Sequence, residues 1–230
     1  MENVLRKEYF KLINYWLILL LTLISIIVVV GGLTRLTDSG LSITTWDVVI
    51  GILPPLNNEE WIKLFNLYKE IPQYYLMNTD MTMNEFKIIY YWEYAHRILG
   101  RLLGIIFLLP FIFIYLKKIV SKKYILNFLI LFFLILLQGT VGWYMVKSGL
   151  TENTTVSHFR LAIHLNLALI LFSAIFWHFL NLNSKKNIKF FDLNQDNIGQ
   201  KIFILLIFLQ ITFGAFTSGL DAGKVYQTWQ

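Results

Sequence analysis

The sequence contains no cysteine and few charged residues: only 15% of its 230 residues are Asp, Glu, Lys or Arg. The lack of cysteine excludes disulfide bonds, thiolate metal sites, iron–sulfur clusters and cysteine nucleophiles. The charged fraction is well below the roughly 25% of a typical soluble domain, while 57% of the residues are hydrophobic. A soluble protein of this size cannot bury so much apolar surface in one core. The composition therefore excludes an ordinary soluble domain or a disordered chain and indicates a protein embedded in lipid.

Long apolar runs account for this composition. A membrane-spanning helix needs about 20 mostly apolar residues, and five stretches meet that requirement. The first is too long for a cleaved signal peptide, and no A-x-A-like site follows it. The predicted spans are residues 12–33, 90–116, 124–146, 160–181 and 202–219.

Basic residues gather in three short segments that five alternating spans place on one side of the membrane. The positive-inside rule assigns this side, with the N-terminus, to the cytoplasm. The loop 34–88 then lies outside. The net charge of +6 is thus explained by topology, and we expect no nucleic acid as a partner. The basic residues of these segments are Arg6, Lys7, Lys11, Lys117, Lys118, Lys122, Lys123, Lys185, Lys186, Lys189 and Lys201.

The outer loop 34–88 contains a predicted amphipathic helix. Apolar residues recur at helical spacing over residues 57–71, and we expect this helix to lie on the outer membrane interface. Thr82 and Glu85 fit a capping box, which predicts a helix that continues without a break into the second span. The apolar stripe consists of Trp61, Leu64, Phe65, Tyr68 and Ile71.

A shift of 183 residues aligns the end of the first span with the end of the fifth. Duplicated halves are common in membrane proteins. We therefore expect an all-α polytopic membrane protein with one four-helix transmembrane bundle (residues 1–182). A cytoplasmic linker and the first helix of a second, pseudo-symmetric bundle follow (residues 183–230), so we interpret the chain as a truncated product. The identical pairs are Gly31/Gly214, Thr34/Thr217, Asp38/Asp221, Gly40/Gly223, Thr45/Thr228 and Trp46/Trp229.

Ionisable residues within the spans are costly and are functional candidates by default. His96 in the second span and His164 in the fourth lie at similar depths near the outer leaflet, counted at about 1.5 Å per residue. These two spans run in the same direction and are diagonal in an up-down bundle. Two imidazoles at matching height suit the axial ligation of a haem iron.

Other residues in the spans have simpler alternative interpretations. We interpret His158 as interfacial because it lies at the mouth of the fourth span. We interpret His178 in the same way, because a second bis-histidine site that used it would need a partner where the second span has Pro110. Glu93 is placed for proton transfer or for orienting water at the edge of a macrocycle, and the alternative, an i,i+4 ion pair with Arg97, is compatible with that role. Three arginines either bind carboxylates such as haem propionates or extend to the interface. These are Arg97, Arg101 and Arg160.

Glycines accompany the histidine candidates. Gly100 and Gly104 continue the face of His96, where they would let a porphyrin or a neighbouring helix approach. In the third span we expect Gln138, Gly139 and Gly142 to serve helix packing.

Several stretches resemble the haem A synthase family, and together they cover nearly the whole chain in order. The second span carries the signature E-x-x-H-R-x-x-G-R over residues 93–101. One subgroup of the family has a cysteine pair in the first outer loop, and this chain is similar to the mitochondrial and proteobacterial type that lacks it. The matching stretches are residues 31–42, 51–56, 93–101, 138–150, 156–165, 219–223 and 228–229.

The resemblance implies eight spans in two pseudo-symmetric bundles and the oxidation of haem O to haem A for terminal oxidase assembly. Two successive hydroxylations would convert the C8 methyl group to a formyl group. His96 and His164 would be the axial ligands of the substrate haem, and Glu93 would be catalytic. A haem b cofactor would be held by the second bundle, with no ligand in this chain.

The family also implies a location and partners. We expect the bacterial cytoplasmic membrane, or the mitochondrial inner membrane in a eukaryote. Expected partners are the lipid bilayer, the farnesyltransferase that makes haem O, and a second copy of the chain. Two alternative functions stay open: a haem-binding protein for electron transfer or haem delivery, which would not need Glu93, and an inactive fragment of the synthase.

Overall fold

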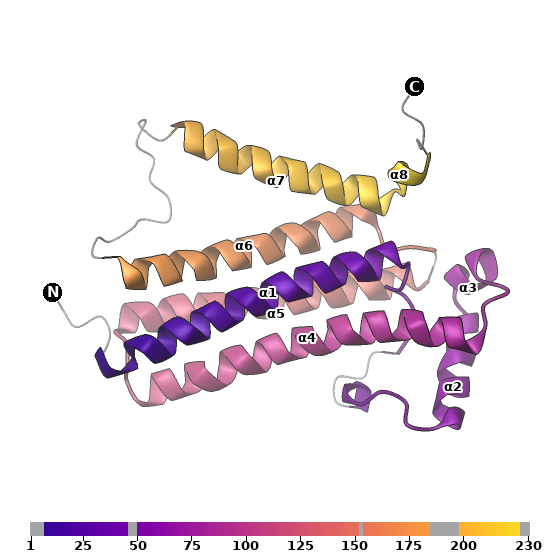
Figure 1. Cartoon of the computed structure of the whole chain (residues 1–230), viewed down its shortest axis with the longest axis horizontal. Helices are drawn as coiled ribbons and strands as arrows, with labels where there is room; N and C mark the ends of the chain where they lie inside the picture. The colour runs from indigo at the N-terminus through magenta and orange to yellow at the C-terminus, as the bar shows by residue number, and fades with distance from the viewer. Residues whose placement is uncertain (1–6, 46–49, 152–153, 185–197, 226–230) are drawn as a thin grey trace.

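A computed structural model describes residues 7–45, 50–151, 154–184 and 198–225. In these ranges every regular element is a helix, which confirms the predicted all-α class (Figure 1). Five of the helices are long and apolar enough to cross a membrane, and each contains one predicted span. They are α1 (Phe10–Leu36), α4 (Met83–Leu116), α5 (Lys122–Gly149), α6 (His158–Asn183) and α7 (Ile198–Gly219).

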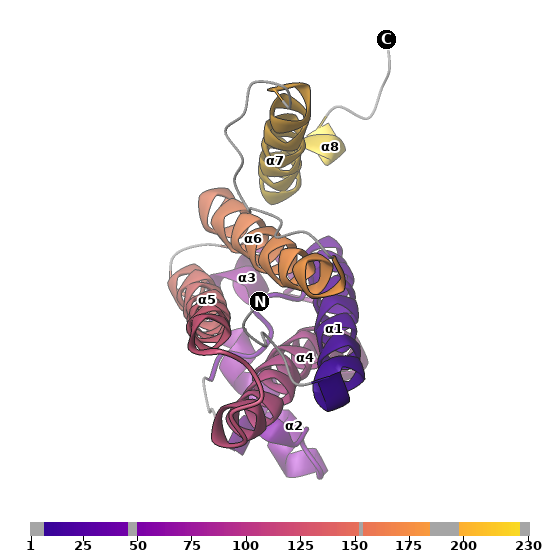
Figure 2. The same ribbon diagram turned by 90° about the vertical axis from the view of Figure 1, so that its left-hand side faces the viewer.

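Four of these helices form a closed ring. Helix α1 packs against α4 and α6, and α5 completes the ring between them. Helices α4 and α6 are therefore diagonal, as predicted (Figure 2). In the half away from α2 and α3, the buried rings of Trp16, Phe107 and Phe128 fill the centre, and Trp16 Nε1 donates a hydrogen bond of 2.8 Å to the carbonyl of Ile106. Large apolar side chains also cover the outside of the bundle, as expected for helices that face lipid.

Helix α4 begins outside the bundle with the predicted capping box. Thr82 Oγ1 accepts a hydrogen bond from the backbone N–H of Glu85, and Glu85 Oε2 accepts one of 2.7 Å from the backbone N–H of Thr82. The helix then runs through Pro110 to Leu116. This confirms the prediction of one unbroken helix.

Two short helices, α2 (Asn58–Lys69) and α3 (Pro72–Met77), pack beside the first turns of α4. The amphipathic helix is confirmed, with Asn57 as its N-cap. Its place on the outer membrane interface stays a prediction, but its apolar stripe packs on protein, because Trp61, Phe65 and Tyr68 are buried against Phe86 at the start of α4. The stripe is covered by protein and is not free to contact lipid. Burial also raises the pKa of Tyr68 to about 12.

Helix α7 lies outside the ring, against α6, and the short helix α8 (Ala222–Val225) follows it (Figures 1 and 2). The 183-residue repeat is visible in its backbone. Helices α1 and α7 end at the equivalent residues Leu36 and Gly219, and the equivalent Asp38 and Asp221 both have φ of 50°. The two copies therefore leave their helices through the same left-handed turn.

One arginine, Arg35, connects the two copies of the repeat at the ends of α1 and α7. The guanidinium of Arg35 donates hydrogen bonds of 2.7 Å to Asp38 and 2.5 Å to the carbonyl of Ser218, and it lies 3.1 Å from the carboxylate of Asp221. Ser218 is the counterpart of Arg35 in the repeat, so equivalent turns touch each other. Some residues named above for the charge distribution and the repeat lie outside the described ranges: Arg6, Trp46, Lys185, Lys186, Lys189, Thr228 and Trp229.

Candidate functional site

Two predicted site residues meet between the diagonal helices. The ring of His96 on α4 and the ring of His164 on α6 have their centroids 6.5 Å apart, with the ring planes at 63°. An imidazole nitrogen binds a metal ion at about 2 Å and lies about 1 Å from its ring centre, so rings on opposite sides of one ion would be about 6 Å apart. The observed separation of the ring centres is close to this value.

Two imidazoles supply only two ligands to such an ion. Among the described residues, no three His, Cys, Asp or Glu side chains come close enough to form a metal site. A metal held by His96 and His164 would thus need further ligands from elsewhere, which is the situation of an iron that arrives within a porphyrin.

Glycines on two other helices make space for the rings. A Cβ atom on Gly31 of α1 would lie 3.0 Å from His96 Nε2, and one on Gly142 of α5 would lie 2.8 Å from His164 Cε1. Gly142 was predicted to serve helix packing, but its contact is with the histidine ring. Around Gly100 and Gly104, an added Cβ would meet no atom within 4 Å, so this face is open.

Gln138 on α5 is also part of the site. Its Nε2 donates a hydrogen bond of 3.0 Å to the carbonyl of His164 and lies 3.4 Å from that residue's Nε2. In the described part of the chain, Gln138 Oε1 and His164 Nδ1 are buried without a hydrogen-bond partner. The prediction that Gln138 serves only packing is therefore incomplete, because its amide contacts a candidate ligand.

Glu93 lies one turn outward of His96 on α4 and is buried. Its Oε2 accepts hydrogen bonds from the Ser42 hydroxyl at 2.7 Å and from the backbone N–H of Ile43 at 2.8 Å. Its Oε1 accepts two from Arg97, at 3.0 Å from Nε and 2.5 Å from Nη2. The predicted ion pair with Arg97 is confirmed. Four donors surround the carboxylate, as a buried charge requires.

This network fixes the start of the outer loop above the histidines. Arg97 also donates to the carbonyls of Ile43 at 2.9 Å and Thr45 at 3.3 Å. Residues 42–45 are thus tied to α4 through Glu93 and Arg97. Ser42 and Ile43 could not be predicted as partners, since they lie about 50 residues from Glu93 and belong to no repeating pattern.

The remaining arginine candidates have different surroundings. Arg101 lies one turn inward of Arg97 on α4. Arg160 donates a hydrogen bond of 2.5 Å to the Ser148 hydroxyl, and its guanidinium lies 4.9 Å from the ring centre of Tyr144. Arg160 therefore joins the outer ends of α5 and α6.

The other two histidines lie apart from this pair. The ring of His158 contacts Phe216 of α7, and the backbone of His158 lies against Gly219. His178 is buried beside Tyr124 and Phe128, toward the other end of the bundle. Neither ring contacts His96 or His164.

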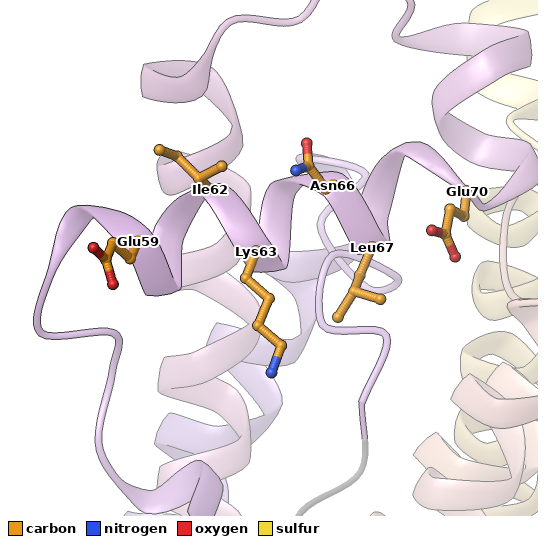
Figure 3. Close-up of a pocket in the computed structure, with 6 residues that line it drawn as sticks. All are labelled: Glu59, Ile62, Lys63, Asn66, Leu67 and Glu70. Atoms are coloured by element: carbon orange, nitrogen blue, oxygen red, sulfur yellow. The ribbon is translucent and has the colours of Figure 1, made fainter.

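A separate hollow of about 440 Å³ lies far from the histidines, along the exposed side of α2. Figure 3 shows that its labelled side chains project from this one helix and from Glu70 just after its end, and that they enclose little between them. No titratable residue of the histidine site contributes to it. We therefore place the functional site at the two histidines. The hollow is lined by Glu59, Ile62, Lys63, Asn66, Leu67 and Glu70.

The chain is similar to proteins of a known family. The family described as cytochrome oxidase assembly protein matches residues 14–230. A haem A synthase of Pelagibacter ubique is 51% identical over 224 residues, which cover 96% of this chain and 65% of the relative. The haem A synthase of Parvibaculum lavamentivorans is 48% identical over 94% of this chain and 62% of its own length.

A third relative, the haem A synthase of Bradyrhizobium diazoefficiens, is 43% identical over 97% of this chain and 61% of its own length. The chain thus spans somewhat less than two thirds of these relatives. No solved structure matches significantly. On the strength of the family match and of these identities, the chain belongs to the cytochrome oxidase assembly protein family that includes the haem A synthases.

Proposed function

We propose that the chain binds haem O between His96 and His164 and takes part in its oxidation to haem A. The observation that carries this proposal is the meeting of the two rings, 6.5 Å apart, from diagonal helices. The open glycine face at Gly100 and Gly104 gives a flat apolar ring access to α4. The relatives named haem A synthase support the same substrate.

The reaction that we propose changes one methyl group of the substrate. With water as the source of the oxygen atom, each hydroxylation replaces a C–H bond of the C8 methyl by C–OH and releases two electrons and two protons. The geminal diol formed by the second hydroxylation loses water and leaves the formyl group. When bound, haem b would carry electrons away, and we assign it no ligand in this chain.

We assign Glu93 the catalytic role in proton transfer. It lies one turn outward of His96, on the side where the outer loop covers the site. A donor must turn away from one oxygen before that oxygen can take a proton. Ser42 is the donor that can do so, because the carbonyl of Ile89, at 3.3 Å from its hydroxyl, offers that hydroxyl a second acceptor.

A haem-binding protein without oxidation chemistry is the second candidate function. The four hydrogen bonds to Glu93 favour it, because they give this residue a purely structural reason to be present. In that case the chain would deliver haem or transfer electrons.

We also propose an orientation and location. Lys117, Lys118, Lys122 and Lys123 gather at the α4–α5 connection, at the end of the bundle opposite α2 and α3. This end would face the cytoplasm in the bacterial cytoplasmic membrane, with the N-terminus on the same side. The farnesyltransferase that makes haem O is the partner we expect to supply the substrate.

Mass spectrometry of extracted haems tests the function. The full chain would be expressed in a host that makes haem O and lacks its own haem A synthase. We expect haem A or its hydroxymethyl intermediate in the membranes. Haem O that co-purifies unchanged would support the binding protein instead, and a purified chain without haem would contradict both functions.

Adding one methyl group at Gly142 is expected to weaken haem binding. The Cβ of a Gly142→Ala variant would overlap the ring of His164, which must then turn or move. Changes that misorient a metal ligand usually cost about 10- to 100-fold in affinity. Gly139→Ala is the matched control on the same helix, because its Cβ would meet no atom within 4 Å. Haem titration followed by absorbance compares the two, and equal affinities would argue against a ligand role for His164.

A further inference from the structure

A second hollow lies directly beside the histidine site. Its volume is about 310 Å³, and it lies between the outer-loop segment Ile43–Thr45, helix α4 and helix α5. Like the site, it is at the end of the bundle that carries α2 and α3. Its lining residues are Ile43, Thr44, Thr45, Arg97, Trp143, Val146, Lys147 and Leu150.

Its position follows from the helix geometry. Arg97 is the residue after His96 on α4. Val146 is one turn outward of Gly142, whose position contacts the ring of His164. The hollow therefore lies within about one helical turn of the histidine site along α4 and α5, close enough for one edge of a large flat ligand held between the two rings.

The lining combines apolar side chains with two cations. Trp143, Val146 and Leu150 give an apolar wall. Arg97 is already engaged by Glu93 and two loop carbonyls. Lys147 differs, because its ammonium lies 5.0 Å from the ring centre of Trp143 and forms no ion pair among the described residues. A ligand that fits this hollow has an apolar body and an anionic group.

We propose that this hollow receives the propionate carboxylates of the haem and that Lys147 is the cation that binds them. The inference rests on the proposed function, since it needs a porphyrin between His96 and His164. A porphyrin has the required chemistry: an apolar ring whose carboxylates lie together on one edge. Lys147 on α5 thereby takes the role that the sequence suggested for Arg97, Arg101 and Arg160.

Lys87 provides a matched control. Its ammonium lies 5.1 Å from the ring centre of Trp61, nearly the same arrangement as that of Lys147 over Trp143. Lys87 is on α4 near its outer end but does not line the hollow. A change that acts only through loss of charge or of a lysine–tryptophan contact would affect both positions alike.

The test compares iron protoporphyrin IX with its dimethyl ester, which lacks the two negative charges. Each would be titrated into the purified full chain and into its Lys147→Met and Lys87→Met variants. We expect the parent to bind the free acid about tenfold more tightly than the ester, the size of one hydrogen bond to a charged group. Lys147→Met should remove this preference by weakening only the free acid, and Lys87→Met should keep it.

The outcomes separate the two proposals. If the parent binds neither porphyrin, the proposed function is wrong. If it binds both equally, or if Lys147→Met keeps the preference, haem binding stands and the assignment of Lys147 is overturned. If Lys147→Met weakens both porphyrins equally, the residue supports the fold of the site and does not contact carboxylates, which also overturns the assignment.

Discussion

Replacing His164 by alanine is expected to abolish haem binding, with a loss of affinity of about 100-fold or more, beyond the 10- to 100-fold typical of residues that only support a ligand. The variant removes one of the two imidazoles that meet between α4 and α6. His96→Ala should have the same effect, because each ring supplies one side of the proposed iron site. Haem titration and the low-spin absorbance spectrum of the reconstituted chain measure both variants.

His178→Ala is the control for this prediction. His178 lies on the same helix and is buried, but its ring is beside Tyr124 and Phe128. Its loss should leave the haem spectrum unchanged even if it lowers stability. A low-spin bis-histidine spectrum that survives in His164→Ala, or disappears only in His178→Ala, would refute the assignment of the ligands.

Replacing Glu93 by alanine is expected to destabilise the folded chain by about 3–5 kcal/mol, the usual cost of leaving one partner of a buried ion pair alone. The side chain of Arg97 is only 11% exposed, so its charge would remain poorly solvated. Ser42 and the backbone N–H of Ile43 would lose their acceptor as well. Reversible unfolding in mixed detergent micelles measures the change.

A double-mutant cycle tests whether the unpaired charge of Arg97 causes this loss of stability. Removing both partners, as in Glu93→Ala with Arg97→Met, should cost clearly less than the sum of the two single changes, because no unpaired charge stays buried. Glu93→Gln keeps the shape of the side chain and should fall between the parent and Glu93→Ala. Additive single changes would mean that the ion pair does not hold the outer loop on α4.

The membrane helices and their caps could be predicted because their signals are local. To predict a 34-residue helix such as α4, a capping box and an uninterrupted apolar run are enough, and both can be recognised in neighbouring residues of the sequence. Helix α2 was predicted by the same reasoning, but its packing against the start of α4 was not. Whether Trp61 faces lipid or Phe86 depends on how the chain folds back over 25 residues, and periodicity carries no information about that.

In the candidate site, too, the local features could be predicted and the contacts between distant segments could not. Counting residues from the ends of the spans places His96 and His164 at one level, and an i,i+4 spacing pairs Glu93 with Arg97. The partners from other segments were missed. Gly142 was interpreted as a packing glycine, because a glycine next to another helix and a glycine next to a histidine ring look the same in sequence.

The length of α4 places the site near the boundary between the lipid hydrocarbon and water. At about 1.5 Å per residue its 34 residues extend about 51 Å, while the hydrocarbon layer is about 30 Å thick, so about 20 Å of the helix projects beyond the lipid. Because α2 and α3 cover the first turns of α4, the projecting part is at that end. Glu93 is ten residues, or about 15 Å, from Met83. It thus lies where the acyl chains give way to water. On the proposed function, the apolar tetrapyrrole would arrive sideways from the lipid, while protons would reach the buried carboxylate of Glu93 from the aqueous side, past the loop segment at Ser42 and Ile43 that covers it.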